Sequence, residues 1–179
     1  MRRVVTIVVS VLAVSAGAFA QTPEERALLA APPQMKDAAT IIKWKSDFTY
    51  DTVKKGTNRL VCYDLSGMPT HQPFTVECTS LANLDRVAQN LKFEALGTKE
   101  KTQAALDAAE KDGTRVKPEF GSVWIHLMGA DPDHARRHTT IAVPGATAQS
   151  LGLPDNPKQG GVWIMNAGTS TAHLMTPGS

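Results

Sequence analysis

Short runs of apolar residues, separated by polar stretches rich in glycine and proline, recur along the chain, a pattern that indicates strands joined by turns. Six such runs are expected to be strands: 37–45, 59–64, 74–78, 140–143, 162–165 and 171–175. The strongest strand is expected at 121–129, where both alternating sets are apolar enough to be largely buried. The polar stretches 47–57 and 134–138 are expected to be loops.

The middle of the chain changes to a helical period. Apolar residues recur there at spacings of three and four, which places them on one helix face: Leu81, Leu84, Val87, Ala88 and Leu91. Gly97 is expected to end this helix, and a second, solvated helix is expected from about Thr98 to Asp112. Strands at both ends of the chain with two central helices predict an α+β fold with a mostly antiparallel sheet.

The N-terminus has the composition of an export signal. Arg2 and Arg3 precede an apolar run at 4–14, and the small residues around Ala20 are typical of a signal-peptidase site. The run is shorter than the roughly 20 apolar residues that span a membrane. We therefore expect cleavage after Ala20 and release of a chain without a membrane span into the periplasm or the medium.

The domain organisation follows from this signal. Residues 1–20 are the expected signal peptide, 21–36 a leader segment broken by two prolines, and 37–179 a single α+β domain.

Charge excludes one class of partner. Two of the 19 basic residues and none of the 17 acidic residues lie in the first twenty positions, so the rest of the chain has no formal net charge. A protein that binds nucleic acid needs a basic stripe or patch, and short pairs such as Lys54-Lys55 and Arg136-Arg137 do not form one. Nucleic acid is not an expected partner.

Two cysteines remain in the expected mature chain, Cys62 and Cys78. In an oxidising compartment an even pair predicts a disulfide. The alternatives are a redox-active dithiol, which usually has the closer Cys-x-x-Cys spacing, and a pair of metal thiolates.

Two groups of residues resemble a known family. The first is Gly56-Thr57-Asn58-x3-Cys62, and the second is Gly160-Gly161-x-Trp163-x-Met165-x-x-Gly168-Thr169-x-x-Ala172-His173-x-Met175. Together, over about 38–177, they resemble a family of exported bacterial proteins that is a domain of unknown function. The resemblance implies export, the cysteine pair and a single domain, and it supplies no catalytic residues. Relatives often continue the second cysteine with Tyr-His, where this chain has Thr79-Ser80.

Histidine and methionine give the sharpest chemical signal. His126 and Met128 share one face of the strand at 121–129, and His173 and Met175 share one face of the last strand. If these strands pair in register, two imidazoles and two thioethers converge, a ligand set that suits Cu(I). The alternative is that the methionines fill gaps in the core and the histidines are partly buried hydrogen-bonding residues. No cofactor is expected, and copper is the alternative.

Aromatic residues are candidates for the wall of a ligand cleft. Trp124, Trp163 and Tyr63 could line such a cleft, because ligand pockets are mostly apolar with few polar groups. The alternative is that these large side chains belong to the core.

The sequence lacks the usual patterns of hydrolases, such as a Gly-x-Ser-x-Gly elbow or a His-Glu-x-x-His pair. This favours a non-catalytic binding or interaction module for a small molecule or an envelope partner. Two alternatives come from other classes. One is the His/Met copper-handling protein, and the other is a hydrolase of unfamiliar type, which needs a histidine within reach of a serine and an acid.

Overall fold

The computed structural model describes residues 21–176. The expected signal peptide and its cleavage after Ala20 lie outside the described residues. Among those that are described, no helix is long and apolar enough to cross a membrane.

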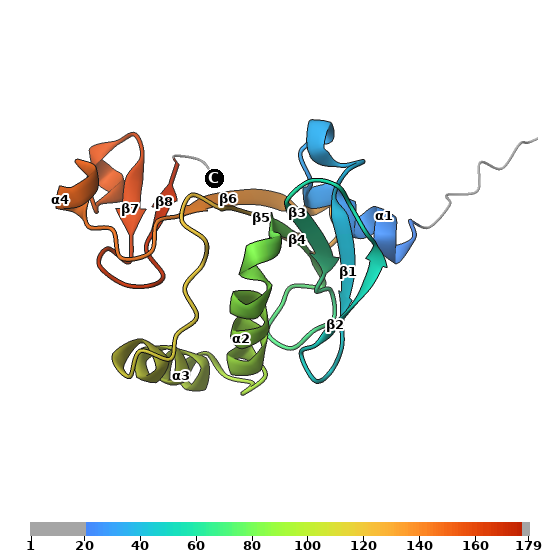
Figure 1. Cartoon of the computed structure of the whole chain (residues 1–179), viewed down its shortest axis with the longest axis horizontal. Coiled ribbons are helices and arrows are strands. Elements are labelled where there is room, and N and C mark those ends of the chain that lie inside the picture. The colour runs from blue at the N-terminus through green and yellow to red at the C-terminus, as the bar shows by residue number, and fades with distance from the viewer. Residues whose placement is uncertain (1–20, 177–179) are drawn as a thin grey trace, which may run out of the picture.

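The strands of the described chain form one eight-stranded sheet in the order β2-β1-β3-β4-β5-β6-β8-β7 (Figure 1). Neighbouring strands are antiparallel, except that β1 and β3 are parallel. The strands are β1 (Thr40–Trp44), β2 (Tyr50–Lys54), β3 (Leu60–Asp64), β4 (Phe74–Ser80), β5 (Val123–Gly129), β6 (Arg136–Ala142), β7 (Trp163–Met165) and β8 (His173–Met175). With two longer helices and one disulfide, this confirms the predicted α+β class.

The alternation of side chains gives the sheet two different faces. On β3, Cys62 belongs to a cluster on one face, and Val61 and Tyr63 belong to a cluster on the other. The first face includes Phe74, Val76, Cys78 and Ile125. The second face includes Ile42, Trp44, Val61 and Tyr63, with Trp124 packed against them.

The disulfide joins the two central strands. Cys62 and Cys78 are direct register partners on β3 and β4, with their Cα atoms 4.1 Å apart, and both are fully buried. The predicted pairing is confirmed.

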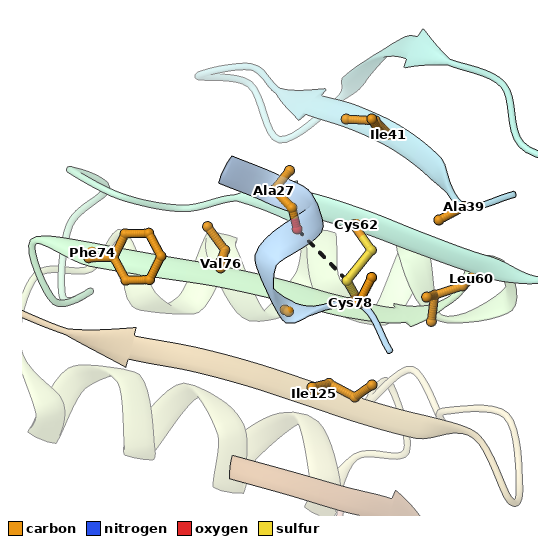
Figure 2. Packing of buried hydrophobic residues seen from close by; sticks show 11 residues of the cluster. Ala27, Ala39, Ile41, Leu60, Cys62, Phe74, Val76, Cys78 and Ile125 are labelled. Atoms are coloured by element: carbon orange, nitrogen blue, oxygen red, sulfur yellow. Dashed lines mark hydrogen bonds between the residues drawn. A yellow bond between two sulfur atoms is a disulfide. The ribbon is translucent and has the colours of Figure 1, made fainter. Parts of the chain in front are cut away.

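The N-terminal segment packs on the first face, over this disulfide. It consists of α1 (Pro23–Ala27) and the 3-10 turns Leu28–Ala30 and Pro33–Met35. Ala27 and Ala30 are buried, and the Ala27 carbonyl oxygen lies 3.9 Å from the Cys78 sulfur (Figure 2). Alanine lets the backbone approach this closely. Residues interpreted as a leader therefore contribute to the core of the fold.

The second face is covered by α2 (Leu84–Glu94), and α3 (Lys99–Lys111) packs beside α2. Leu84, Val87 and Leu91 are buried against the sheet, each contributing about 2 kcal/mol of hydrophobic stabilisation. The predicted helix start at Leu81 is a 3-10 turn, Leu81–Asn83, capped by Ser80, and Leu81 itself is exposed.

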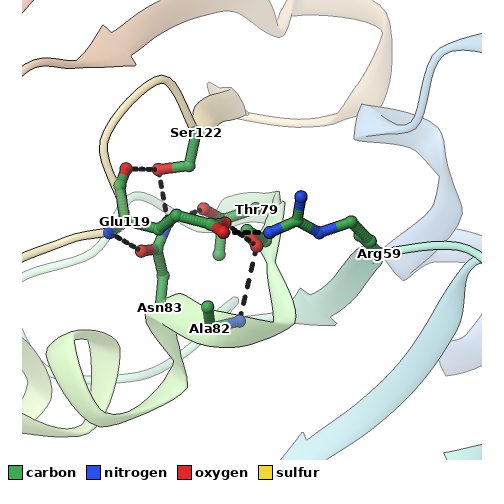
Figure 3. A network of polar contacts seen from close by, with 7 residues as sticks. Arg59, Thr79, Ala82, Asn83, Glu119 and Ser122 are labelled. Atoms are coloured by element: carbon green, nitrogen blue, oxygen red, sulfur yellow. Dashed lines mark hydrogen bonds and ion pairs between the residues drawn. The ribbon is translucent and has the colours of Figure 1, made fainter.

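A buried polar network fixes the start of α2 against the sheet (Figure 3). The Asn83 amide donates to Thr79 Oγ1 at 2.8 Å and to Ser122 Oγ at 2.9 Å, and it accepts from the Glu119 backbone N–H at 2.8 Å. Glu119 also accepts from Ser80 and pairs with Arg59. The network ties the helix to β4 and to the chain entering β5, so the space between α2 and the sheet is held open at a fixed spacing.

β6 begins four residues earlier than predicted. Residues 134–138 are predicted to be a loop, but residues 136–141 pair with β5, from Met128↔Arg136 to Val123↔Ile141. The polar stretch that contains β2 likewise pairs with β1, and its five residues are exposed. Pairing with an apolar neighbour, rather than burial of their own side chains, makes these segments strands.

The C-terminal part extends the sheet through β8 and β7 and carries the short helix α4 (Ala148–Leu151). It has its own small core of Val143, Ala146, Ile164 and Ala172.

Candidate functional site

A cavity of about 240 Å³ lies between α2 and the second face of the sheet. Five residues of α2 form its roof: Arg86, Val87, Asn90, Leu91 and Glu94. They recur at spacings of one, three and four along the helix, so they share one helix face. The same face that buries apolar residues against the sheet thus carries an arginine, an amide and a carboxylate into the cavity.

The floor comes from three neighbouring strands. β6 supplies His138, Thr140 and Ala142, which alternate along the strand and so point to the same side. Trp124 and His126 of β5 lie opposite Thr140 and His138, and Glu77 of β4 lies opposite His126. The sides are closed by His71, Pro118 and residues 171–173. Four of the five histidines of the chain therefore line one cavity.

Glu77 is the buried centre of one end of the cavity. It accepts a hydrogen bond from the Tyr63 hydroxyl at 3.1 Å and one from His126 Nδ1 at 2.7 Å. Tyr63 is fully buried beneath it, and Glu77 itself is 7% exposed. Because a carboxylate only accepts, the proton of the His126 ring is on Nδ1, and Nε2 has no hydrogen-bond partner among the described residues.

The two groups adjust each other's protonation. Burial opposes a charged imidazole, but the charge of Glu77, its hydrogen bond and the more distant Glu94 together raise the pKa of His126 above its ordinary value. Burial likewise opposes a charged carboxyl, but His126, His71 and Tyr63 together lower the pKa of Glu77. Burial raises the pKa of Tyr63 well above its usual value, so its hydroxyl stays a donor.

A second histidine–carboxylate pair stands beside the first. His71 Nε2 donates to Glu94 Oε2 at 3.1 Å, joining the β3–β4 loop to the end of α2. Burial disfavours the charged ring, but the hydrogen bond and charge of Glu94 outweigh it and raise the pKa of His71.

The other two histidines have no carboxylate partner among the described residues. The His138 ring lies 6.0 Å, centroid to centroid, from that of His126. His173 donates from Nδ1 to the Thr171 carbonyl at 2.7 Å, which fixes its orientation at the opposite end of the cavity.

Arg86 brings a buried cation to the roof. It is 3% exposed, and its Nη1 donates to the Val116 carbonyl and, at 3.3 Å, to Ser170 Oγ. Burial and the nearby Arg115 guanidinium lower the pKa of Arg86 to about 10, so the side chain remains charged at neutral pH. Ser170 in turn donates to Glu110 from its backbone N–H and its hydroxyl.

Arg115 forms hydrogen bonds to two residues of α2, Gln89 and Asn90. Its Nη1 donates to Gln89 Oε1 at 2.5 Å and its Nη2 donates to Asn90 Oδ1, which holds the amide of Asn90 at the cavity wall.

The structure does not bring the four predicted copper ligands together. β6 lies between β5 and β8, with His138 opposite His126 and Ala142 opposite His173. Four residues along β6 and two strand spacings separate the Cα atoms of His126 and His173 by about 16 Å. Met128 lies two residues further from the His173 end, and Met175 pairs with Trp163. No group of three or more His, Cys, Asp or Glu that could hold a metal ion occurs among residues 21–176.

Of the three aromatic residues predicted to line a ligand cleft, one lines the cavity. Trp124 lines it, and Tyr63 lies behind Glu77. Trp163 is on the edge strand β7 and is not among the lining residues.

Several lining residues were not singled out from the sequence. Glu77 alternates with Val76 and Cys78 and so falls on the polar side of its strand, where no local pattern marks it as buried. Arg86 and Glu94 look like ordinary solvated positions of an amphipathic helix, and His71 lies in a turn. Only their tertiary placement brings them to the cavity.

The hydrolase arrangement of histidine, serine and acid is not present in the described part of the chain. No serine there is hydrogen-bonded to a histidine, and Ser170 is held by Glu110 and Arg86.

Comparison with known proteins finds no matching family model, curated protein or solved structure.

Proposed function

We propose that the protein is an exported, non-catalytic binding module that holds a small molecule in the cavity between α2 and the sheet. The observation that carries the proposal is the lining of the cavity. Trp124, Val87 and Leu91 offer apolar surface, while Arg86, Asn90 and the histidine rings converge on the same space. Apolar walls with a few placed polar groups are the usual composition of a ligand site.

The polar groups of the cavity are suited to binding because they are held in place. Glu77 and Glu94 each fix one histidine ring, and Arg115 fixes Asn90. Donors that are already oriented lose little freedom when a ligand arrives, which favours affinity.

Export is the second part of the proposal. The N-terminal sequence, the buried disulfide and the resemblance to a family of exported bacterial proteins support a location in the periplasm or outside the cell. In that setting the ligand is a small molecule of the envelope or the medium.

A thermal-shift screen tests the proposal. The mature protein is incubated with a panel of amino acids, sugars, nucleosides, organic acids and phosphate esters, and its melting temperature is recorded. A ligand at about 100 times its dissociation constant adds about 2.7 kcal/mol to the free energy of unfolding. For a domain of this size that raises the melting temperature by about 5 to 10 °C.

The control is a variant with a filled cavity. Thr140→Trp places an indole in the cavity, and Thr139→Trp places it on the opposite face of the same strand. Hits must stabilise the wild type and Thr139→Trp but not Thr140→Trp, with Thr171→Trp as a second filled variant if the first does not fold. A panel without hits, or hits that stabilise the filled variants equally, contradicts the proposal.

A further inference from the structure

Arg86 is a buried cation without a carboxylate partner. It is 3% exposed, and no carboxylate of the described residues forms an ion pair with it. Its Nη1 makes both of its hydrogen bonds, so Nη2 and Nε have no protein acceptor in the described part of the chain. A buried charge normally has a partner, because removing it from water is otherwise costly.

The negative charge of Glu110 favours the charged form of Arg86 and raises its pKa, but Glu110 is linked to Arg86 by hydrogen bonds only through Ser170. Glu110 accepts from the Ser170 hydroxyl, and that hydroxyl accepts from Arg86 Nη1. Arg115, a second buried cation, lies near enough to disfavour the charge on Arg86. The protein thus holds two guanidinium groups close together without a carboxylate in contact with either.

The remaining charges of the cavity are matched. Glu77 is paired with His126, and Glu94 is paired with His71. Of the charged groups lining the cavity, Arg86 is therefore the one that forms no ion pair in contact with a carboxylate of residues 21–176. Asn90 of the same helix, held by Arg115, lines the cavity beside it.

We propose that the ligand of this cavity is a small organic anion, a carboxylate or a phosphate monoester, whose anionic group binds Arg86. This rests on the proposed function. The free Nη2 and Nε of Arg86 supply a fork of two donors, which matches the two oxygens of a carboxylate or phosphate. The apolar part of the ligand packs against Trp124 and Val87.

Binding of matched charged and neutral probe compounds tests whether the cavity prefers an anionic ligand. We would measure the binding of acetate, inorganic phosphate, benzoate and phenyl phosphate by calorimetry, with benzamide as the neutral counterpart of benzoate. At probe concentrations up to about 20 mM, at least one anion is expected to bind, and benzoate at least about tenfold more tightly than benzamide. Stronger binding of phenyl phosphate than of benzoate identifies a phosphate ester, and the reverse order identifies a carboxylate.

Two variants with the same change in net charge locate the site. Arg86→Gln keeps a donor toward Val116 and is expected to weaken anion binding by at least about tenfold. Arg137→Gln removes a cation that donates to the Ala30 and Leu29 carbonyls on the first face, and it is expected to leave binding within about twofold. If Arg86→Gln does not fold, Arg86→Lys keeps the charge and is expected to lose affinity because it lacks the fork.

The outcomes separate this inference from the proposed function. If neutral compounds of the metabolite panel bind in the cavity but no anion does, or if Arg86→Gln binds anions as well as the wild type, the anion inference is overturned and cavity binding stands. If neither these probes nor the panel bind, both are overturned.

Discussion

The Glu77–His126 pair gives the most sharply defined prediction about stability. The perturbation is His126→Leu, which replaces the ring by an apolar side chain of similar size. It removes the 2.7 Å hydrogen bond and the balancing charge from a carboxylate that is 7% exposed. Glu77 then keeps a single partner, the Tyr63 hydroxyl at 3.1 Å.

The magnitude follows from the burial of the pair. Breaking a fully buried ion pair by removing one partner costs roughly 3–5 kcal/mol. The His126 side chain is 23% exposed and that of Glu77 is 10% exposed, so water screens part of the interaction. We expect His126→Leu to lower the free energy of unfolding by about 2–3 kcal/mol near pH 6.

His138→Leu is the matched control. His138 lies directly opposite His126 on β6, lines the same cavity and has no carboxylate partner among the described residues. The same substitution there is expected to cost less than about 1 kcal/mol. Equilibrium unfolding in urea, followed by circular dichroism, measures both variants. Equal costs for the two, or a cost below about 1 kcal/mol for His126→Leu, would refute the reasoning that His126 holds a charged Glu77.

Three further predictions concern pH, the disulfide and one glycine. The Glu77→Gln/His126→Asn double variant removes both titrating groups. In the folded protein the pKa of His126 is raised above 6.5 and that of Glu77 is lowered below 4.5. The wild type should therefore exceed this variant in stability most strongly between pH 4.5 and 6.5. It should fall as the pH rises through the pKa of His126 and as it drops through that of Glu77, and an advantage that keeps growing above pH 8 in a pH series of melts would contradict the assignment. Cys62→Ala/Cys78→Ala should cost about 3 kcal/mol in urea unfolding, whereas an unchanged midpoint would show that the bond adds nothing. Gly56→Ala should cost about 2 kcal/mol or more, because its Cβ would lie 2.2 Å from the Ala38 carbonyl oxygen; a melting temperature equal to that of the wild type would mean that this approach of the two backbones is not tight.

Local patterns predicted the elements whose own side chains decide their structure. β4 alternates between apolar and polar residues, and β3 and β5 are short runs that are largely apolar on both faces. The apolar positions of α2 recur with helical spacing, so the positions of these elements follow from the sequence within a few residues. The disulfide followed from cysteine count and the expected compartment, and the register of β3 against β4 makes it possible.

Elements that depend on a neighbour were missed. β2 is exposed along its length and is a strand because it pairs with β1. The first half of β6 is polar, and it is a strand because β5 needs a partner along its full length. The N-terminal segment carries few large apolar residues, yet Ala27 and Ala30 are buried because small side chains let the backbone lie on the disulfide.

Local sequence patterns identified only some of the residues that line the cavity. The sequence pointed to His126, His173 and Trp124, and all three line the cavity. The copper hypothesis also required the strands of His126 and His173 to be neighbours, and β6 separates them. The order of strands in a sheet depends on long-range pairing, which no local pattern encodes, so the partners Glu77, Arg86 and Glu94 could not be assigned in advance.

The histidine rings offer the most direct test of ligand binding in the cavity. His71, His126, His138 and His173 line it, whereas His134, the fifth histidine, is exposed and pairs with Asp131 outside it. Ring carbon–proton NMR signals of all five would be recorded during titration with the compound that gives the largest thermal shift. If a ligand binds in the cavity, the signals of the four cavity histidines shift saturably and the His134 signal stays unchanged. Unchanged cavity signals, or shifts at His134 as large as those in the cavity, would contradict binding in the cavity.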